Sequence, residues 1–475
     1  MTELKRLLNW KSTEDALAGA LRESTVGEAL RLLAMGKPFL LVRNWFGQLT
    51  VLLPCTREAL ERSECGSFFD DLKTIAGPLA LTPWVLCVDE LFEADAYWSD
   101  PSLLRLDPTH APSDPLALML LERQDKENDW LIPVNTANTS SNPTKSAKRT
   151  VFFSIKGGVG RSTALVMLAI TLATKGKRVL VVDGDFESPG LSSSVLPRGE
   201  GQPAYGVVDW LTAQALGADS ATLQGMARSQ VVEASPLNAT LGLQGQILVA
   251  PAYGRETQTY VSKLARIYRR SSDGMSYATR LNQFLEMVEG EHKIDVTLFD
   301  SRAGIDDTAA VAITQLRADV SFLFAVNTRQ TWDSYGLLFE HLRRNLNLFW
   351  KTLPESGSNE TELQNEWDLR RSLRLVSALT PQASQAETYL SDMRYSAYDV
   401  FNDIYDDASD DPARSFAEPF APAPDTPDAP HYPIAIMAID DLRAFDPLRK
   451  PSQLTDALNQ AAFVDFVRAS SELLN

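Results

Sequence analysis

The segment SIKGGVGRST, residues 154–163, combines residue types that can hold a phosphate group. Gly157, Gly158 and Gly160 permit backbone angles that other residues rarely adopt, so several main-chain N–H groups can point inward together. An apolar strand precedes this turn and a helix follows it, and the positive end of a helix favours an anion. Ser162 adds a hydroxyl, an oxygen ligand of the kind that Mg²⁺ accepts. The segment therefore predicts a phosphate-binding loop.

Three aspartates stand where predicted strands end. Asp183 and Asp185 follow the apolar run RVLVV, and Asp300 follows VTLF. The carboxyl ends of the strands form the ligand-binding edge of an open α/β sheet, so we expect these carboxylates beside the loop. Phosphoryl transfer needs positioned charge, and Mg²⁺ keeps several waters, so one hydroxyl and one or two carboxylates suffice. The alternative is that each aspartate only caps a helix, and it stays open for Asp183 above all.

The loop carries a specific family resemblance. KGGVGRST resembles the deviant Walker A motif, KGGxGK[ST], of the ParA/MinD group of P-loop ATPases. In that group an extra lysine reaches across a dimer to the nucleotide of the partner subunit, and Lys156 matches this lysine. Ser162 matches the Mg²⁺ ligand and Thr163 the residue that faces the α-phosphate. The resemblance implies that nucleotide is bound by Lys156, Gly157, Gly158, Val159, Gly160, Arg161, Ser162 and Thr163.

Two further segments resemble the same group. KRVLVVDGDFESPGLS is similar to its second strand and switch I, which implies that Asp185 orients the attacking water. DVTLFDSRAG is similar to Walker B and switch II, which implies that Asp300 holds a water of the Mg²⁺ shell and that Gly304 senses the γ-phosphate. Asp183 matches the first member of the D-x-D pair, and we expect it at the metal.

The sequence departs from the pattern at two arginines. Arg161 replaces the usual lysine; arginine keeps the charge and binds phosphate bidentately, but it is wider and planar. Either Arg161 fits the phosphates and acts in catalysis, or it swings outward and leaves Lys156 as the main cation. Switch II reads DSRAGIDD, where Arg302 is either an arginine finger, in cis or across a dimer, or the partner of Asp306 or Asp307 in a salt bridge.

Base recognition has one candidate. The group often uses an asparagine at the end of a late strand, and LRLVSALTPQ offers none there. Asn327, after the strand VSFLFAV, is therefore the candidate for the base, with capping of the next turn as the alternative.

These residues need a sheet to position them. After residue 150, near-continuous apolar strands alternate with helices, which predicts a mostly parallel α/β sheet with helices on both faces, of the P-loop NTPase type. An acidic, proline-rich insertion at 405–433 is expected to be a mobile surface loop, and residues 451–475 read as one amphipathic helix packed on the sheet. The ATPase-like domain spans 150–475.

A separate module precedes the sheet. The polar stretch 135–149 reads as a linker, and residues 1–134 as a smaller α+β module. PFLLVRNW and QLTVLLP predict a hairpin, and LALMLLERQDKENDWLIP, residues 116–133, predicts a helix ending near Asn128.

Composition limits the partners. The formal net charge of −17 argues against broad binding to nucleic acid. The basic stretch 262–280 keeps nucleic acid possible, but a solvated or partner-facing helix surface is the favoured reading. Three scattered cysteines predict no metal site or disulfide framework. The charged N-terminus and the lack of a long apolar run favour a cytoplasmic protein without a membrane anchor.

The resemblance implies a molecular switch. ATP and Mg²⁺ would bind between two identical subunits, and slow hydrolysis would reopen the dimer and signal to a protein partner through residues 1–134. Arginine-containing relatives suggest bacterial multi-protein systems, such as partition or anti-phage defence systems. The alternative is a scaffold or sensor subunit that binds nucleotide without hydrolysing it, because Arg161 and the altered switch II have removed hydrolysis.

Overall fold

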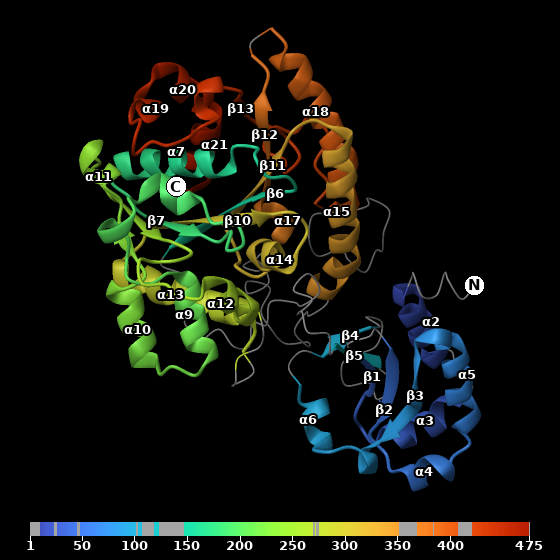
Figure 1. Cartoon of the computed structure of the whole chain (residues 1–475). Helices are drawn as coiled ribbons and strands as arrows, with labels where there is room; N and C mark the ends of the chain where they lie inside the picture. Colours follow the sequence, from blue (N-terminus) through green and yellow to red (C-terminus); the bar gives the residue numbers. More distant parts are fainter. Residues whose placement is uncertain are drawn as a thin grey trace, which may run out of the picture. The chain divides into compact units, whose positions relative to one another are not determined.

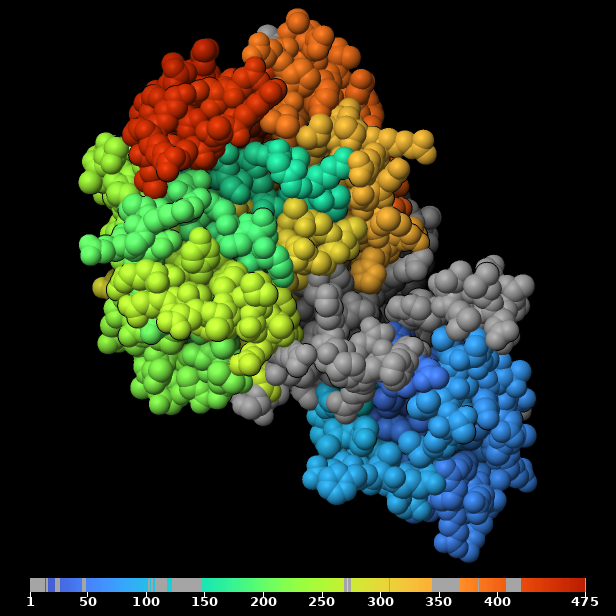
Figure 2. All heavy atoms as spheres, in the orientation of Figure 1, coloured from blue at the N-terminus to red at the C-terminus, as the bar shows by residue number. Residues whose placement is uncertain are grey.

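The computed structural model describes residues 10–22, 26–44, 48–100, 103–106, 118–122, 147–268, 271, 275–350, 368–382, 384–406 and 420–474. The chain divides into two compact units, one of residues 1–128 and 346–353 and one of residues 129–345 and 354–475 (Figures 1 and 2). Within the described residues, no helix combines the length and the apolar composition that crossing a bilayer requires.

The first unit is built on a mixed five-stranded sheet, in the order β3-β2-β1-β5-β4. The expected hairpin is present, with β1 and β2 antiparallel and Leu41 opposite Val51. The strands are β1 (Phe39–Arg43), β2 (Leu49–Leu53), β3 (Ala80–Cys87), β4 (Leu104–Arg105) and β5 (Leu118–Glu122). The helices are α2 (Trp10–Arg22), α3 (Gly27–Ala34), α4 (Arg57–Glu61), α5 (Gly66–Ala76) and α6 (Ala94–Trp98).

The helix expected over residues 116–133 is wrong where the structure describes it. Leu118–Glu122 forms strand β5, which pairs in parallel with β1. Leu118, Leu120 and Leu121 are all buried, and a short apolar run of this kind suits a strand covered on both faces as well as a buried helix. Residues 123–146, with the rest of that segment and most of the expected linker, lie outside the described residues.

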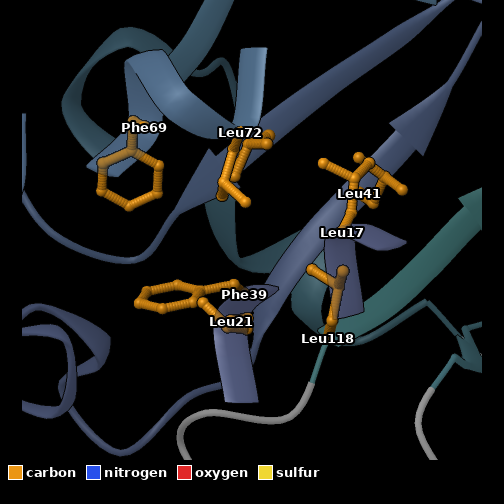
Figure 3. A pocket seen from close by; sticks show the side chains of 8 residues that line it. Leu17, Leu21, Phe39, Leu41, Phe69, Leu72 and Leu118 are labelled. Carbon is orange, nitrogen blue, oxygen red and sulfur yellow. The ribbon is translucent and has the colours of Figure 1, made fainter. Parts of the chain in front are cut away.

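The core of the first unit encloses a cavity of only about 10 Å³ (Figure 3). Its lining is wholly apolar, and a site of this size without polar partners is packing space, not a ligand pocket. The side chains around it are Leu17, Leu21, Phe39, Leu41, Val51, Phe69, Leu72 and Leu118.

The second unit contains an eight-stranded sheet in the order β13-β12-β11-β6-β10-β7-β9-β8. All neighbouring pairs are parallel except β8 with β9, so the predicted fold class is confirmed. The strands are β6 (Lys148–Ser154), β7 (Arg178–Asp183), β8 (Glu233–Ala234), β9 (Gln246–Ala250), β10 (Val296–Ala303), β11 (Val320–Ala325), β12 (Leu373–Thr380) and β13 (Ile434–Met437).

Helices cover both faces of this sheet (Figure 1). Helices α7 and α21 lie on one side, and α9, α12, α13 and α14 on the other. The main helices are α7 (Arg161–Thr174), α8 (Leu191–Val195), α9 (Val207–Ala215), α10 (Ser220–Ser229), α11 (Leu237–Thr240), α12 (Tyr260–Ile267), α13 (Tyr277–His292), α14 (Asp307–Thr314), α15 (Arg329–Trp350), α17 (Leu369–Ser372), α18 (Ala386–Phe401), α19 (Ser452–Thr455), α20 (Ala457–Ala462) and α21 (Val464–Leu474).

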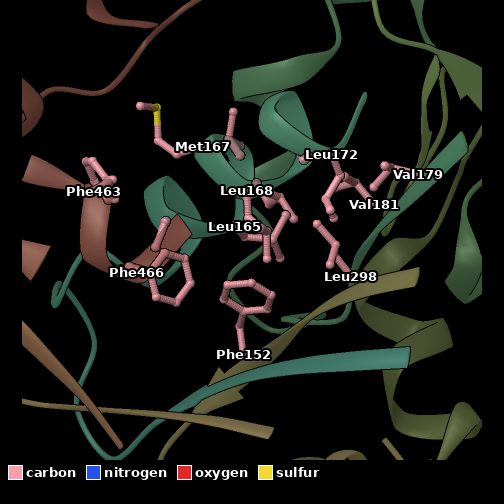
Figure 4. Close-up of a cluster of buried hydrophobic side chains, with 14 of the residues drawn as sticks. Phe152, Leu165, Met167, Leu168, Leu172, Val179, Val181, Leu298, Phe463 and Phe466 are labelled. Atoms are coloured by element: carbon pink, nitrogen blue, oxygen red, sulfur yellow. The ribbon is translucent and has the colours of Figure 1, made fainter. Parts of the chain in front are cut away.

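Helix α7 is held by apolar packing along most of its length (Figure 4). Leu165, Leu168 and Leu172 point from it toward the sheet and are essentially inaccessible to solvent. Phe466 of α21 packs edge-on against Phe152 of β6, with ring centroids 6.2 Å apart. The helix that follows the glycine-rich loop is therefore fixed to the strand that precedes it.

The C-terminal region packs on the sheet as expected, but as three short helices instead of one. Asp456 accepts hydrogen bonds from the backbone of Leu458 and Asn459 and so begins α20 afresh after α19. An N-cap of this kind ends the preceding turn and starts the next helix.

The described part of the acidic, proline-rich insertion is not a loose loop. His431 is fully buried, its Nδ1 lies 2.7 Å from the Tyr405 hydroxyl, and its Nε2 lies 3.1 Å from the Pro424 carbonyl. Phe401 and Phe420 pack around the same tyrosine. Residues 420–433 are thus docked through an aromatic cluster, while residues 407–419 lie outside the described residues.

Candidate functional site

The glycine-rich loop joins β6 to α7 at the carboxyl edge of the sheet. Gly158 and Gly160 have φ of +77° and +79°, a region that L-residues rarely adopt. No side chain caps the first turn of α7, so its N–H groups have no partner within the helix. A helix start of this kind, after a glycine-rich turn, binds an anion.

Arg161 points inward from this turn. Its side chain is only 10% exposed, and its Nε donates to Asp300 Oδ1 at 2.5 Å. Nη1 donates to the Ser154 hydroxyl at 3.2 Å, and Nη2 lies 3.5 Å from Asp185 Oδ2. The side chain does not swing outward in this conformation, because its guanidinium binds carboxylates at the strand ends. Its contact with the phosphates stays a prediction.

Ser162 contacts the same carboxylate from the next position. Its hydroxyl donates to Asp300 Oδ2 at 2.6 Å, so the two oxygens of Asp300 are taken by consecutive residues of α7. Asp300 is buried and lies directly opposite Asp183 in the register of β10 and β7. The structure therefore brings together the residues that the sequence placed at separate strand ends.

Asp183 is the most deeply buried of the three aspartates. Its Oδ2 accepts hydrogen bonds from the Ser192 backbone N–H and hydroxyl, at 3.1 and 2.7 Å. Burial, together with the nearby Asp300 carboxylate, raises the pKa of Asp183 to about 7. Its Oδ1 is buried without a hydrogen-bond partner. No motif in the sequence pointed to Ser192, because a serine nine residues later is not a recurring signal.

Asp185 lies just beyond the end of β7, where it is partly exposed. Burial raises the pKa of this carboxyl group, and the adjacent Arg161 guanidinium opposes the increase. Its Oδ1, like that of Asp183, is buried without a hydrogen-bond partner. Asp183 and Asp185 therefore each have one buried carboxylate oxygen without a hydrogen-bond partner.

Arg302 forms salt bridges instead of standing alone. It lies 3.2 Å from Glu187 Oε1 and 3.1 Å from Asp306 Oδ2, so the salt-bridge alternative is present in this conformation. Gly304 has φ of +103°, and its N–H donates to the Ser154 carbonyl at 3.0 Å. The segment predicted as switch II is thus tied to the end of the loop strand.

Lys156 and Thr163 are less buried than Arg161. Both are half-buried, and among the described residues the Lys156 ammonium group has no hydrogen bond or ion pair. The Lys156 backbone carbonyl accepts a hydrogen bond from the Ser154 hydroxyl at 2.8 Å. The hydrogen bond from Ser154 thus fixes the backbone of the loop at Lys156, while the lysine ammonium group can still bind another group.

Asn327 holds neighbouring helices. Its Oδ1 accepts the Trp332 indole N–H at 2.7 Å, and its backbone N–H donates to the Tyr389 hydroxyl at 2.8 Å. These contacts join the end of β11 to α15 and α18. The Asn327 side chain bonds to an indole and not to a backbone N–H, and Thr328 Oγ1 accepts the Thr331 N–H at the start of α15. The contacts therefore do not show the capping alternative, and a role of Asn327 at the base stays a prediction.

The basic stretch is largely internal where it is described. Arg280 is fully buried and donates to the carbonyls of Leu211 and Ile267, and Lys263 is paired with Asp209. Arg266 is exposed, and residues 269–270 lie outside the described residues. A continuous basic surface is not formed by the described part of this stretch.

Three residues near the site were not found from the sequence. Glu187 lies in the turn that begins at Asp185, and Tyr260 and Tyr268 donate hydrogen bonds to this turn. Tyr268 belongs to the basic stretch and Tyr260 lies just before it. No spacing in the sequence linked either tyrosine to a strand end more than 70 residues earlier.

A comparison with protein-family models matches residues 150–387 to the CobQ/CobB/MinD/ParA nucleotide binding domain. This match covers half of the chain and includes the loop and all three aspartates. A comparison with curated proteins found no match.

Three solved structures are similar to the chain at low sequence identity and low TM-score. The chain is similar to a ParA family ATPase from Chlorobium tepidum, with 15% identity and a TM-score of 0.37, over 67% of this chain and 98% of that one. It is similar to the MinC:MinD cell division protein complex of Aquifex aeolicus, with 16% identity and a TM-score of 0.39, over 69% and 96%. It is also similar to apo McdA from Cyanthece, with 15% identity and a TM-score of 0.40, over 69% and 100%.

Proposed function

We propose that this chain, which belongs to the CobQ/CobB/MinD/ParA family of nucleotide-binding domains, is an ATP-hydrolysing molecular switch. One observation carries the proposal: Arg161 and Ser162, at the uncapped start of α7, both bind Asp300. The predicted anion site at the first turn of α7 therefore lies directly beside the buried Asp300 carboxylate of β10. That combination supports the binding of a nucleotide whose phosphates bridge the loop and a cation.

Magnesium fits the oxygen atoms gathered here. Ser162, Asp300 and Asp183 would hold it, and the unpartnered Oδ1 atoms of Asp183 and Asp185 leave acceptors free. Mg²⁺ keeps several waters when it binds to proteins, so one hydroxyl and one or two carboxylates would suffice. When bound, Mg²⁺ neutralises charge on the β- and γ-phosphates.

The chain's own residues would supply the remaining chemistry. Loop amides and the side chains of Lys156 and Arg161 bind phosphate oxygens, and Thr163 lies beside the α-phosphate. Asp185 orients the attacking water through its carboxylate, and its raised pKa brings it closer to exchanging a proton. Gly304, tied to Ser154, would report the γ-phosphate to switch II.

The dimer part of the proposal starts from Lys156, whose ammonium group has no hydrogen bond or ion pair among the residues that the structure describes. We propose that Lys156 reaches the nucleotide of a second copy, so that two chains enclose two ATP molecules. Residues 1–134 would pass this state to a protein partner, in a bacterial partition-type or defence system. Light scattering with and without saturating Mg·ATP tests the first step, with Lys156→Ala as the comparison. Wild-type protein that stays monomeric in Mg·ATP contradicts the dimer.

A second function is favoured by the ion pairs of Arg161. The Arg161 guanidinium binds both Asp300 and Asp185. These ion pairs would keep Asp300 from the magnesium shell and Asp185 from the attacking water. The chain would then be a scaffold or sensor that binds nucleotide without cleaving it. Phosphate release measured for the wild type and for Asp185→Ala separates the two. Release that depends on Asp185 supports the enzyme, and equal background release supports the scaffold.

A further inference from the structure

The residue predicted to orient water begins a tight turn. The Ser188 N–H donates to the Asp185 carbonyl at 3.2 Å, which closes a four-residue turn with Phe186 and Glu187 at its corners. Phe186 is fully buried, whereas Glu187 lies at the surface. The direction of Asp185 therefore depends on what holds these two corner residues.

Two tyrosine hydroxyls, one from the first residue of α12 and one from the residue directly after it, bind these corner residues. Tyr260 donates to the Phe186 carbonyl at 2.8 Å, and Tyr268 donates to Glu187 Oε1 at 2.5 Å. Arg302 of the switch II segment lies 3.2 Å from the same Glu187 oxygen. The turn is thus bound by Tyr260 of α12, by Tyr268 just after α12, and by Arg302 of the switch II segment.

The tyrosines are themselves fixed in place. The ring of Tyr260 packs edge-on against Tyr253, and that of Tyr268 against Tyr277, with centroids 5.6 and 5.3 Å apart. Burial raises the pKa of Tyr268, so its hydroxyl keeps its proton and donates to the carboxylate. Each tyrosine ring is therefore packed against a second aromatic ring, and we call Tyr260, Tyr268 and Glu187 the clamp.

We propose that Tyr260, Tyr268 and Glu187 are positioning residues that set the orientation of Asp185, so that α12 governs the rate of hydrolysis. This inference rests on the proposed ATPase function. It assigns to α12 a task that its basic composition does not suggest. The three clamp residues act on Asp185 through the turn and do not bind the nucleotide themselves. Substituting them should therefore change kcat without changing the affinity for ATP.

The test compares Tyr268→Phe, Glu187→Gln and their combination with wild-type full-length protein. We expect kcat at saturating Mg·ATP to fall about tenfold in each, because small misplacement of a reacting group is costly. The dissociation constant for a non-hydrolysable ATP analogue should stay within about twofold, and the double variant should fall no further than either single variant. Tyr405→Phe is the matched control, since it removes a buried tyrosine hydroxyl bonded to His431 and should leave kcat unchanged.

A kcat that is unchanged or raised in both single variants overturns the clamp, as does an affinity loss that parallels the loss of kcat. Amide hydrogen exchange of residues 184–190 supplies a second readout that needs no hydrolysis. Exchange should be at least about fivefold faster in Tyr268→Phe than in wild type, and equal exchange overturns the clamp. If the wild type releases no phosphate, the ATPase proposal fails, and the exchange result still decides whether α12 holds the turn.

Discussion

Arg161 donates from its Nε to the buried carboxylate of Asp300 at 2.5 Å, across 139 residues of sequence. The contact places a permanent positive charge among three aspartates at the ends of β7 and β10. Burial raises the pKa of Asp183 and of Asp185, and repulsion from the Asp300 carboxylate adds to the increase in both. The guanidinium offsets that repulsion in the nucleotide-free protein.

Removing this charge should destabilise the nucleotide-free protein. Arg161→Ala leaves a buried carboxylate without its partner, which costs about 3–5 kcal/mol in other proteins. Urea unfolding without nucleotide measures the loss. Arg302→Ala is the matched control at the same edge, because that side chain is 38% exposed and its pairs should contribute less than about 1 kcal/mol. Similar losses in the two variants would contradict the argument.

Ser162 should matter to ATP mainly when magnesium is present. Ser162→Ala removes the hydroxyl that binds Asp300 Oδ2 and the proposed metal ligand. Affinity for ATP with Mg²⁺ should fall about 10- to 100-fold, while affinity in EDTA should change less than about twofold. Titration calorimetry in the two buffers measures both. Equal losses in both buffers would assign Ser162 to the phosphates and not to the metal.

The two ends of the loop should respond differently to an added methyl group. Gly160→Ala places an L-residue at φ +79°, and we expect it to cost about 1–2 kcal/mol of stability. Gly157→Ala meets no atom within 4 Å and has no positive φ, so its effect should stay within about 0.5 kcal/mol. Thermal or urea unfolding of the two variants checks the contrast. A Gly157→Ala loss as large as that of Gly160→Ala would refute the conformational explanation.

The docked insertion should loosen as the pH falls. Burial lowers the pKa of His431 below its ordinary value, the Pro424 carbonyl opposes this decrease, and Arg394 adds to it. Below about pH 6.5 the unfolded chain binds a proton that the folded chain excludes. Stability that is present above this pH is therefore lost as the pH falls through it.

The histidine can be isolated by comparing slopes. We expect the urea midpoint of the wild type to fall more steeply between about pH 7.5 and about pH 5.5 than that of His431→Gln, which cannot take up the proton. The comparison of slopes removes the constant loss of packing in the variant. Parallel slopes would show that His431 does not titrate across this range.

Much of this site could be predicted from the sequence because its parts are local. The glycine positions, the helix that follows them and the aspartates at strand ends all depend on neighbouring residues. Parallel strands end at a common edge, so Asp183 and Asp300 had to approach each other once the strands were recognised. The predicted helix over residues 116–133 was wrong at residues 118–122, which form a strand. A short run of apolar residues has no hydrophobic periodicity that would distinguish a buried strand from a buried helix.

What the sequence by itself determined is the chemistry at the sheet edge: a glycine-rich turn, a hydroxyl, two cations and three carboxylates in a parallel α/β frame. Only the tertiary structure decided that Arg161 turns inward, that residues 420–433 are docked on Tyr405, and that α12 grips the turn after Asp185. Each of these depends on side chains far apart in the chain, such as Glu187 and Tyr268, whose positions differ by 81. The rotamers of these side chains depend on packing and charge in the folded state. A local sequence pattern does not contain that information.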